Sequence, residues 1–405
     1  MTNCTPNASY RARILRSLEN MDLIRIKPRY MDSLDDGEIL EKVSTLKPLP
    51  EGCLIIVNDP DRSTPSARIV QLLRAAGILT KPVTFILATG THKVPPRDLA
   101  QKLSGAGPKD TLLIHDASDE NQLVYVGKTA RGTEVIVNRA LKTATHVFTI
   151  NSVEPHYFAG FTGGVKSIVP GLASKKTTTQ NHSWAMNEHA RIMRTIGNPL
   201  YEDLWDACNL VVPTEKVTTV QLVSHGANIL DVFPGTLRAA FEKAKETATR
   251  VYGFTLKEKV DRIVSLVGNP LDDTLYQAQK AMENSKHVLR DGGTFVLVAA
   301  CTQGIGNSEF FNRLHSLGTP DNVLQMLSFE NYQFGDHKAY YWAALAKRVE
   351  LLYTGDLAQD TIKSAFMRKV NIEELITLIK QWQSRGDRIL LDEAGGYSAI
   401  DLQGF

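Results

Sequence analysis

The segment NSVEPHYFAGFTGGVKSIVPGLASKKTTTQNH, residues 151–182, is the most informative stretch of this chain. It holds two histidines, His156 and His182, and it places Lys166 between two glycine-containing turns. The apolar, β-branched run before it, residues 146–150, predicts a buried parallel strand. The glycines therefore follow a strand end, where open α/β sheets bind ligands and where glycine lets backbone N–H groups approach a phosphate. A tight turn with a surface lysine would explain one glycine pair, but this density of histidine, lysine and glycine favours a site.

Two earlier strand ends carry polar side chains as well. Residues 54–57 (LIIV) and 83–87 (VTFIL) are short apolar runs that predict buried strands. Asp59 and Arg62 follow the first run, and His92 follows the second. Taken alone, Asp59 and Arg62 could be explained by a solvated capping loop, and His92 by a structural role. Because loops at the carboxyl ends of parallel strands share one edge of a sheet, three such loops predict one pocket.

Strands and helices alternate along both halves of the 405 residues, which exceed what one core usually organises. The sequence thus predicts an α/β fold of two parallel-sheet domains with the active site in the cleft between them. We expect residues 1–258 to form a cofactor-binding and catalytic domain and residues 259–388 to form a C-terminal domain that closes over the site. The tail, about 389–405, could pack back on the first domain. Residues 183–193 (SWAMNEHARIM) predict a helix.

Composition excludes several functional classes. The net charge is +2 and no basic run is present, which argues against nucleic acid as a partner. The four cysteines are far apart, so a zinc site or disulfide framework is disfavoured and a reducing cytosol is favoured. The start of the chain is polar, and no apolar run is long enough to cross a bilayer. We therefore expect a cytoplasmic protein without a membrane partner.

The second half carries one candidate site segment. After a predicted strand at residues 263–267, a helix is expected to present Tyr276, Gln277 and Lys280. Gln277 and Lys280 are three residues apart and so share a helix face. Such a face is usually just solvated, but the strand end before it favours a role in binding.

These motifs resemble the nickel-pincer lactate racemase family. The matching stretches are PHYFAGFTGGVKSIVPG (155–171), the later NHS (181–183), THK (91–93) and NPLDDTLYQAQK (269–280), and the resemblance spans most of the chain. It implies an isomerase that racemises or epimerises a 2-hydroxy acid. Hydride would leave C2 and return to either face of a planar keto acid, with one base on each side.

The resemblance also implies a cofactor, the nickel pincer nucleotide (pyridinium-3-thioamide-5-thiocarboxylic acid mononucleotide nickel), attached covalently through Lys166. The cofactor supplies two sulfurs and a carbon to nickel, and the family spacing makes His182 the expected protein ligand. The other expected cofactor-binding residues are Asp59 and, around the phosphate, Gly163, Gly164, Ser174, Lys175 and Lys176. Partners implied by the family are the enzymes that make the cofactor: a carboxylase, a sulfur transferase and a nickel insertase.

The remaining site residues are assigned by the same resemblance. His92 and His156 match the two catalytic bases, a role that suits imidazole because its pKa lies near neutrality. Arg62 matches the residue that binds the substrate carboxylate with its planar guanidinium. Tyr276, Gln277 and Lys280 match residues that reach the substrate from the second domain.

Three departures from the family pattern concern the substrate. The first loop carries an extra carboxylate, Asp61; Thr91 replaces an aromatic residue; and alignment puts Lys338 where a tryptophan is usual. All three exchange neutral or apolar groups for polar ones, so we expect a substrate more polar than lactate, a sugar acid or a malate-like acid. Alternatives are a lactate racemase proper, a non-catalytic ligand-binding homologue, or a nicotinamide-dependent 2-hydroxy acid dehydrogenase, although no G-x-G-x-x-G follows the first strand.

Overall fold

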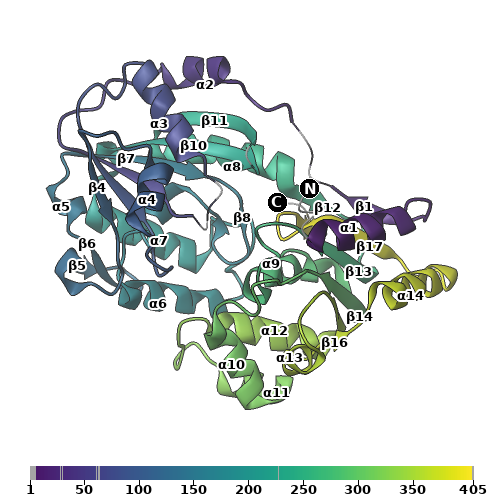
Figure 1. The fold of residues 1–405 in the computed structure, drawn as a ribbon. Coiled ribbons are helices and arrows are strands. Elements are labelled where there is room, and N and C mark those ends of the chain that lie inside the picture. The colour runs from purple at the N-terminus through teal and green to yellow at the C-terminus, as the bar shows by residue number, and fades with distance from the viewer. Residues whose placement is uncertain are drawn as a thin grey trace. The chain divides into compact units, whose positions relative to one another are not determined.

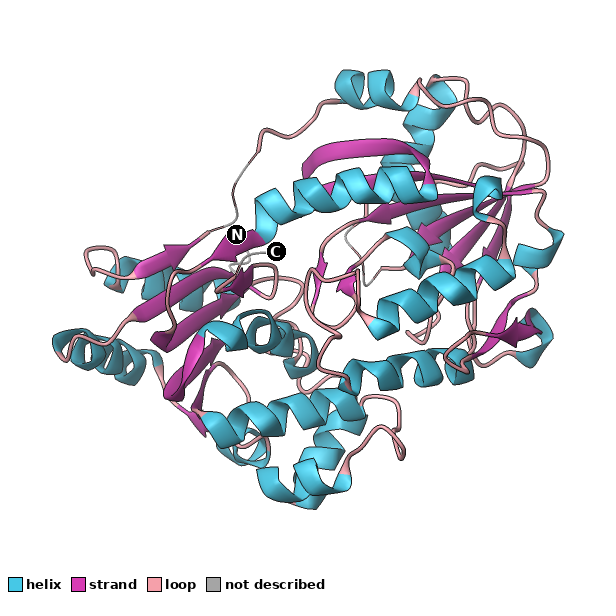
Figure 2. Cartoon of the chain, turned by 180° about the vertical axis from the view of Figure 1, so that it is seen from behind, coloured by secondary structure: helices cyan, strands magenta, loops and turns pink. Residues whose placement is uncertain are grey.

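The computed structural model describes residues 6–27, 29, 31–60, 62, 64–226 and 228–403. The chain divides into two compact units: a central unit, Tyr30–Val251, and a terminal unit made of Met1–Arg29 and Tyr252–Phe405. Each unit has its own mainly parallel sheet, and Figure 2 shows helices beside the strands of both. The predicted α/β class with two domains is therefore confirmed. No helix among the described residues is long and apolar enough to cross a membrane.

The central unit is built on a six-stranded sheet in the order β11-β10-β7-β2-β3-β4 (Figure 1). All neighbours are parallel except β10 and β11, which are antiparallel. The sheet strands are β2 (Cys53–Asn58), β3 (Thr84–Ala88), β4 (Thr111–Ile114), β7 (His146–Ser152), β10 (Val217–His225) and β11 (Asn228–Thr236). Two small hairpins pair β5 (Leu123–Lys128) with β6 (Glu134–Asn138), and β8 (Pro155–His156) with β9 (Gly160–Phe161).

Helices cover this sheet because their apolar positions recur at helical spacing. In α3 (Ser66–Ala75), Ile69, Val70 and Leu73 are fully buried and pack in one cluster with the buried side chains of β2 and β3. The other helices are α2 (Asp36–Val43), α4 (Arg97–Ser104), α5 (Ala140–Thr143), α6 (Lys175–Ser183), α7 (Pro199–Val211) and α8 (Leu237–Tyr252). Short 3-10 turns are η1 (Glu120–Gln122), η2 (Gly164–Ser167), η3 (Trp184–Met186) and η4 (Thr214–Lys216).

The terminal unit has a wholly parallel sheet in the order β1-β17-β13-β14-β15-β16. Its strands are β1 (Ile24–Ile26), β13 (Val260–Val267), β14 (Leu289–Val298), β15 (Glu350–Thr354), β16 (Arg368–Lys369) and β17 (Ile389–Gly395), with β12 (Gly253–Thr255) pairing β18 (Ala399–Asp401). Its helices are α1 (Pro6–Ser17), α9 (Leu275–Ser285), α10 (Ser308–Leu317), α11 (Pro320–Met326), α12 (Asp336–Arg348), α13 (Gln359–Ser364) and α14 (Ile372–Ser384), with one 3-10 turn, η5 (Lys286–Val288).

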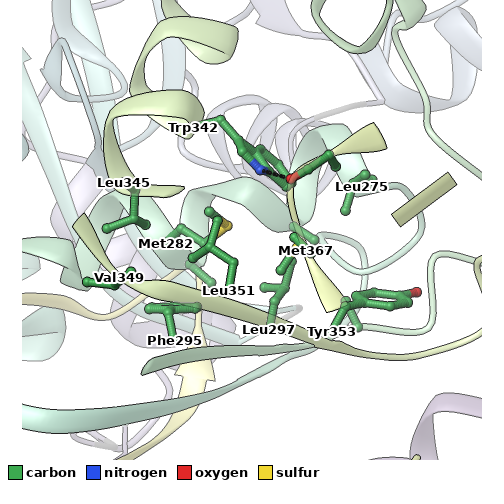
Figure 3. Packing of buried hydrophobic residues seen from close by; sticks show 14 of the residues in the cluster. Leu275, Met282, Phe295, Leu297, Trp342, Leu345, Val349, Leu351, Tyr353 and Met367 are labelled. Carbon is green, nitrogen blue, oxygen red and sulfur yellow. Dashed lines mark hydrogen bonds between the residues drawn. The ribbon is translucent and has the colours of Figure 1, made fainter. Parts of the chain in front are cut away.

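Both faces of this second sheet are buried, as a parallel sheet requires. One face packs against α9, α10 and α12, and Figure 3 shows part of that core, with Trp342, Met282 and Leu351 packed together. The indole Nε1 of Trp342 donates to the carbonyl of Ala365 at 2.6 Å, so the one polar atom of this large ring is satisfied. The other face packs against α1 and α14.

The predicted domain boundaries need correction. The first 29 residues belong to the terminal unit, and the chain passes into that unit at Tyr252 rather than after residue 258. The predicted tail, about 389–405, belongs to the terminal unit, where β17 lies in the sheet between β1 and β13. This pairing joins segments from opposite ends of the chain, and local sequence patterns carry no information about it.

Candidate functional site

The loops after β2 and β3 bring Asp59 and His92 together. Both strands are parallel neighbours, so their carboxyl ends lie at the same edge of the central sheet. Nδ1 of His92 lies 2.6 Å from Oδ2 of Asp59, whose side chain is 3% exposed whereas that of His92 is 40% exposed. Because an ionised carboxylate only accepts, the proton of neutral His92 resides on Nδ1 and the lone pair resides on Nε2. His92 is thus oriented as a base.

The hydrogen bond of His156 favours the tautomer opposite to that of His92. His156 ends β8, and its Nδ1 accepts a hydrogen bond of 3.3 Å from the backbone N–H of Ala159. Since a backbone N–H can only donate, Nδ1 holds a lone pair here and the proton of neutral His156 is on Nε2. The two histidines therefore favour different tautomers, one with a basic Nε2 and one with an Nε2–H donor.

His182 lies near the end of α6 and is neutral. Burial, together with the neighbouring charges of Lys166 and His92, lowers the pKa of His182 to about 3. These electrostatic effects also show that the three side chains lie within interaction range. An imidazole that stays unprotonated at neutral pH keeps a ring nitrogen available as a metal ligand.

Phe158 connects several of these residues, and the sequence analysis did not single it out. Its ring packs edge-to-face with His156 (4.4 Å between centroids, 79° between planes) and with His182 (5.1 Å, 70°). Nζ of Lys166 lies 5.7 Å from the same centroid, in a cation–π arrangement. The signal available in the sequence was the aromatic pair directly after His156.

Backbone and side-chain hydrogen bonds hold the turn that carries Lys166. It is the 3-10 turn η2, in which the N–H of Lys166 donates to Gly163 (3.1 Å) and the carbonyl of Lys166 accepts from Gly171 (2.9 Å). The hydroxyl of Ser167, the next residue, hydrogen-bonds Asn58 Oδ1 at 3.3 Å and also Asn151 Oδ1. These two asparagines belong to β2 and β7, so the Lys166 turn is tied to the strand ends that also position Asp59.

Gly163 and Gly164 have packing roles that differ from the phosphate contact we predicted. A Cβ on Gly163 (φ +75°) would lie 2.8 Å from Oε1 of Gln221, and one on Gly164 would lie 3.0 Å from the ring of Phe241. The N–H of Gly164 already donates to Gln221 Oε1 at 3.1 Å. The amide of Gly164 is thus already bonded to a protein side chain, and the contact of Gly163 and Gly164 with a cofactor phosphate stays a prediction.

The residues predicted around the phosphate on α6 are largely engaged within the unit. The hydroxyl of Ser174 caps the helix by accepting from the N–H of Thr177 (3.1 Å). Nζ of Lys176 lies 2.7 Å from Glu134, whose pKa this contact lowers. Lys175 is exposed in the first turn, so its side chain is the cation that best fits the predicted role.

The predicted substrate residues of the first loop are only partly described. The N–H of Arg62 donates to the carbonyl of Asp59 at 3.2 Å, which closes a turn and places a half-buried guanidinium three residues after the carboxylate. Asp61, the extra carboxylate of this loop, lies outside the described residues.

In the terminal unit, Tyr276, Gln277 and Lys280 share the first turns of α9, whose N-terminus is capped by Thr274. Lys338, on α12, is 3% exposed. Its Nζ donates to the carbonyl of Tyr276 (3.1 Å) and to Oε1 of Gln279 (3.3 Å), and it lies 3.9 Å from the centroid of the Tyr276 ring.

This environment corrects the substrate contact predicted for Lys338. Its amine is enclosed by α9 and supports that helix, so it is not presented to a ligand. Burial, helped by the charge of Lys280 and opposed by Glu283, lowers the pKa of Lys338 to about 7.

A buried carboxylate holds α6 in place behind His182. Asp203, on α7, is fully buried and accepts hydrogen bonds from the hydroxyls of Thr129 (2.5 Å) and Thr133 (2.7 Å). It also accepts from Nδ2 of Asn181 at 2.8 Å. Because Asn181 directly precedes His182, this network fixes the helical turn that carries the predicted nickel ligand. Among the residues that the structure describes, no three His, Cys, Asp or Glu side chains form a metal-binding cluster.

Comparisons with known proteins agree with this architecture. Two family models match, the lactate racemase N-terminal domain over residues 34–193 and the lactate racemase C-terminal domain over residues 257–391. The chain is 26% identical over 299 residues to the lactate racemase of Lactiplantibacillus plantarum, covering 72% of this chain and 70% of the relative. It is 28% identical over 293 residues to the lactate racemase of Thermoanaerobacterium thermosaccharolyticum, covering 70% and 68%.

Solved structures show the same fold. The lactate racemase apoprotein from Thermoanaerobacterium thermosaccharolyticum matches with a TM-score of 0.78 at 21% identity, covering 96% of this chain and 92% of that one. A protein from Thermotoga maritima matches with a TM-score of 0.70 at 18% identity, covering 93% and 100%.

Proposed function

The chain belongs to the lactate racemase family and is a racemase, and we propose that it inverts C2 of a 2-hydroxy acid with a nickel pincer nucleotide as cofactor. Family membership favours an isomerase over the dehydrogenase alternative. The observation that carries the proposal is the pair of histidines, His92 and His156, which are held in different tautomers. Such a pair supports proton transfer at the substrate hydroxyl from two differently prepared rings.

The residues present fit the cofactor. His182 is neutral at physiological pH, so its imidazole can bind nickel, and Lys166 lies close enough to influence its pKa. These two residues would hold the metal and the covalent tether. When bound, the cofactor supplies a hydride acceptor for C2.

The proton chemistry belongs to the chain's own residues. Nε2 of His92 takes the hydroxyl proton as hydride leaves C2, and the buried carboxylate of Asp59 stabilises the imidazolium that forms. Arg62 anchors the substrate carboxylate through its planar guanidinium. His156 offers its Nε2–H to the substrate oxygen in the neutral form. To accept a proton at Nε2 for the other enantiomer, it must give up the long contact from Ala159.

Substrate choice is the finer part of the proposal. Asp61 and Thr91 replace residues that are neutral or aromatic in the family, and they favour a sugar acid or a malate-like acid. Lys338 no longer supports this choice, because its amine is engaged by α9. The names of the matched relatives favour lactate.

The experiment is to produce the protein with the carboxylase, sulfur transferase and nickel insertase that make the cofactor. Intact mass and nickel analysis then report loading, and a chiral assay reports kcat/KM for lactate, malate and gluconate. We expect an adduct that Lys166→Ala lacks and a nickel content that His182→Ala lacks. No adduct on the wild type would refute the cofactor, and no inversion of any acid by loaded protein would indicate a non-catalytic homologue. If lactate is the best of the three substrates, the polar preference is wrong and the chain is a lactate racemase proper.

A further inference from the structure

Phe158 contacts three residues that the proposed function assigns to separate tasks. Its ring edge or face meets the imidazoles of His156 and His182, at 4.4 and 5.1 Å between centroids, and Nζ of Lys166 lies 5.7 Å away. The ring itself is buried, with 4% of the residue exposed. One aromatic ring thus limits the orientations open to a proton-transfer group, a metal ligand and a tether.

The backbone of Phe158 is itself held in place. The fully buried Asn198 donates through Nδ2 to the carbonyl of Phe158 (2.8 Å) and to that of Arg194 (2.9 Å). Its Oδ1 accepts the N–H of Leu200, which caps α7. The small hairpin of β8 and β9 closes around the same residue, since His156 pairs with Gly160. Phe158 is therefore fixed by a helix cap and by a hairpin.

We propose that Phe158 is a positioning residue that sets the ring orientations of His156 and His182 and directs the amine of Lys166 before the tether forms. Edge-to-face packing favours particular angles between rings, so it constrains side-chain rotation in a way that an aliphatic neighbour does not. The cation–π contact attracts the Lys166 ammonium to one face of the ring. The part of this inference that concerns catalysis rests on the proposed function.

The first measurement uses the protein without cofactor. Histidine labelled with ¹³C at Cε1 gives NMR signals for His156 and His182, which variants of each residue identify. Ring currents from Phe158 contribute to the positions of these signals, in addition to the ring current of Tyr157, which is stacked on His156. Phe158→Leu, which keeps an apolar side chain, should therefore remove the Phe158 contribution and shift both signals. Phe158→Tyr keeps the ring and should preserve that contribution. Phe161→Leu is the matched control, because Phe161 is a buried phenylalanine of the same motif that lies on β9.

The second measurement uses protein loaded with cofactor, with racemisation corrected for the adduct measured by mass. Changes to groups that orient metal ligands cost roughly 10–100-fold, so we expect a loss of that size in kcat for Phe158→Leu. KM should stay near the wild-type value, because Phe158 acts through other residues. Phe158→Tyr should restore kcat, and adduct formation should be slower in Phe158→Leu than in Phe161→Leu.

The outcomes separate this inference from the proposed function. Unchanged histidine signals together with kcat close to wild type in Phe158→Leu would overturn the positioning role. Equal losses in Phe158→Leu and Phe161→Leu would also overturn it, since they would indicate general packing. A wild-type protein that takes no adduct would refute the proposed function, whereas the NMR comparison would still test whether Phe158 orients the two rings.

Discussion

At the scale of single residues, the pairing of Asp59 with His92 has the clearest consequence. The buried carboxylate fixes the imidazole tautomer and favours the imidazolium, and an asparagine can supply only the first of these effects. Asp59→Asn should therefore lower kcat by at least about tenfold. This loss is only part of the roughly 10²–10⁴-fold that general base catalysis contributes, because the asparagine still orients the imidazole. The measurement is racemisation at matched adduct content. Activity within about threefold of wild type would remove Asp59 from the proton-transfer machinery.

Lys338 makes stability depend on pH. The folded protein lowers its pKa to about 7 from 10.5, so between these values the unfolded chain binds more protons and stability rises with pH. Lys338→Met abolishes this titration. The variant's melting temperature relative to wild type should be highest near pH 6, where the folded wild type holds a buried ammonium, and should fall steadily toward pH 10. Each pKa unit is worth about 1.4 kcal/mol, so the trend is measurable by thermal denaturation of the cofactor-free protein. A difference that does not change with pH would contradict it.

The sequence predicts several residues of one site because motif and chemistry coincide in them, and their roles stay predictions. The electrostatic neighbourhood of His182 includes Lys166 and His92, as expected for one site. Ring packing around Phe158 could not be predicted, since it depends on side-chain geometry across a hairpin and a helix. The burial of Lys338 could not be predicted either, because its contacts with Tyr276 and Gln279 on α9 depend on how two helices pack.

At the scale of elements, the network around Asp203 joins α7, α6 and the β5–β6 hairpin. Three donors from these elements converge on a fully buried carboxylate. Asp203→Leu leaves them unsatisfied, and each unpaired buried group costs about 1–3 kcal/mol, so we expect a clear drop in the urea midpoint. Asp206→Leu on the same helix is the control, because its contact with Arg131 is partly exposed and 3.9 Å long. Equal effects of the two variants would exclude the network as the cause.

The glycines of the Lys166 turn give a second prediction for elements. Gly163→Ala brings a Cβ to 2.8 Å from Gln221, whereas Gly132→Ala, also at positive φ, meets nothing within 4 Å. Gly132→Ala should lower the free energy of unfolding by about 1–2 kcal/mol, because alanine is strained in the left-handed conformation but meets no other atom there. Gly163→Ala should cost more and should also slow adduct formation on Lys166, because the turn must shift. The measurements are chemical denaturation and intact mass. Equal stability losses with normal adduct formation would show that the turn tolerates a side chain.

Elements themselves were predictable where hydrophobic periodicity is strong. The runs at 54–57, 83–87 and 146–150 all form parallel strands of one sheet. The helix expected at 183–193 is wrong: α6 ends at Ser183, and the helix precedes that segment. The threonines of α6 have low helix propensity, but their hydroxyls form hydrogen bonds. The hydroxyl of Thr177, for example, donates to the backbone carbonyl of Glu134 (2.7 Å). Tertiary contacts therefore override the local preference.

At the scale of the whole molecule, the two ends of the chain fold together. β1 pairs with β17 through residues 24–26 and 390–392, and the fully buried Ile14 and Leu18 of the α1 region pack in the same core as α14. A sequence read in order suggests two consecutive domains, since nothing local reports pairing between its ends. The terminal unit is completed only when both ends are present.

This arrangement predicts the effect of shortening the chain. Deleting residues 1–29 removes β1, exposes the edge of β17 and uncovers apolar side chains of α14, so the terminal unit should lose its stability. Leu18→Ala in the full chain should cost about 2–5 kcal/mol, whereas Arg16→Ala, which changes an exposed residue of α1, should cost less than about 0.5 kcal/mol. Limited proteolysis of the deleted chain, followed by mass analysis, should digest residues 252–405 first and leave a fragment from the central unit. A deletion that melts and digests like the full chain would show that the terminal sheet is stable without its first strand.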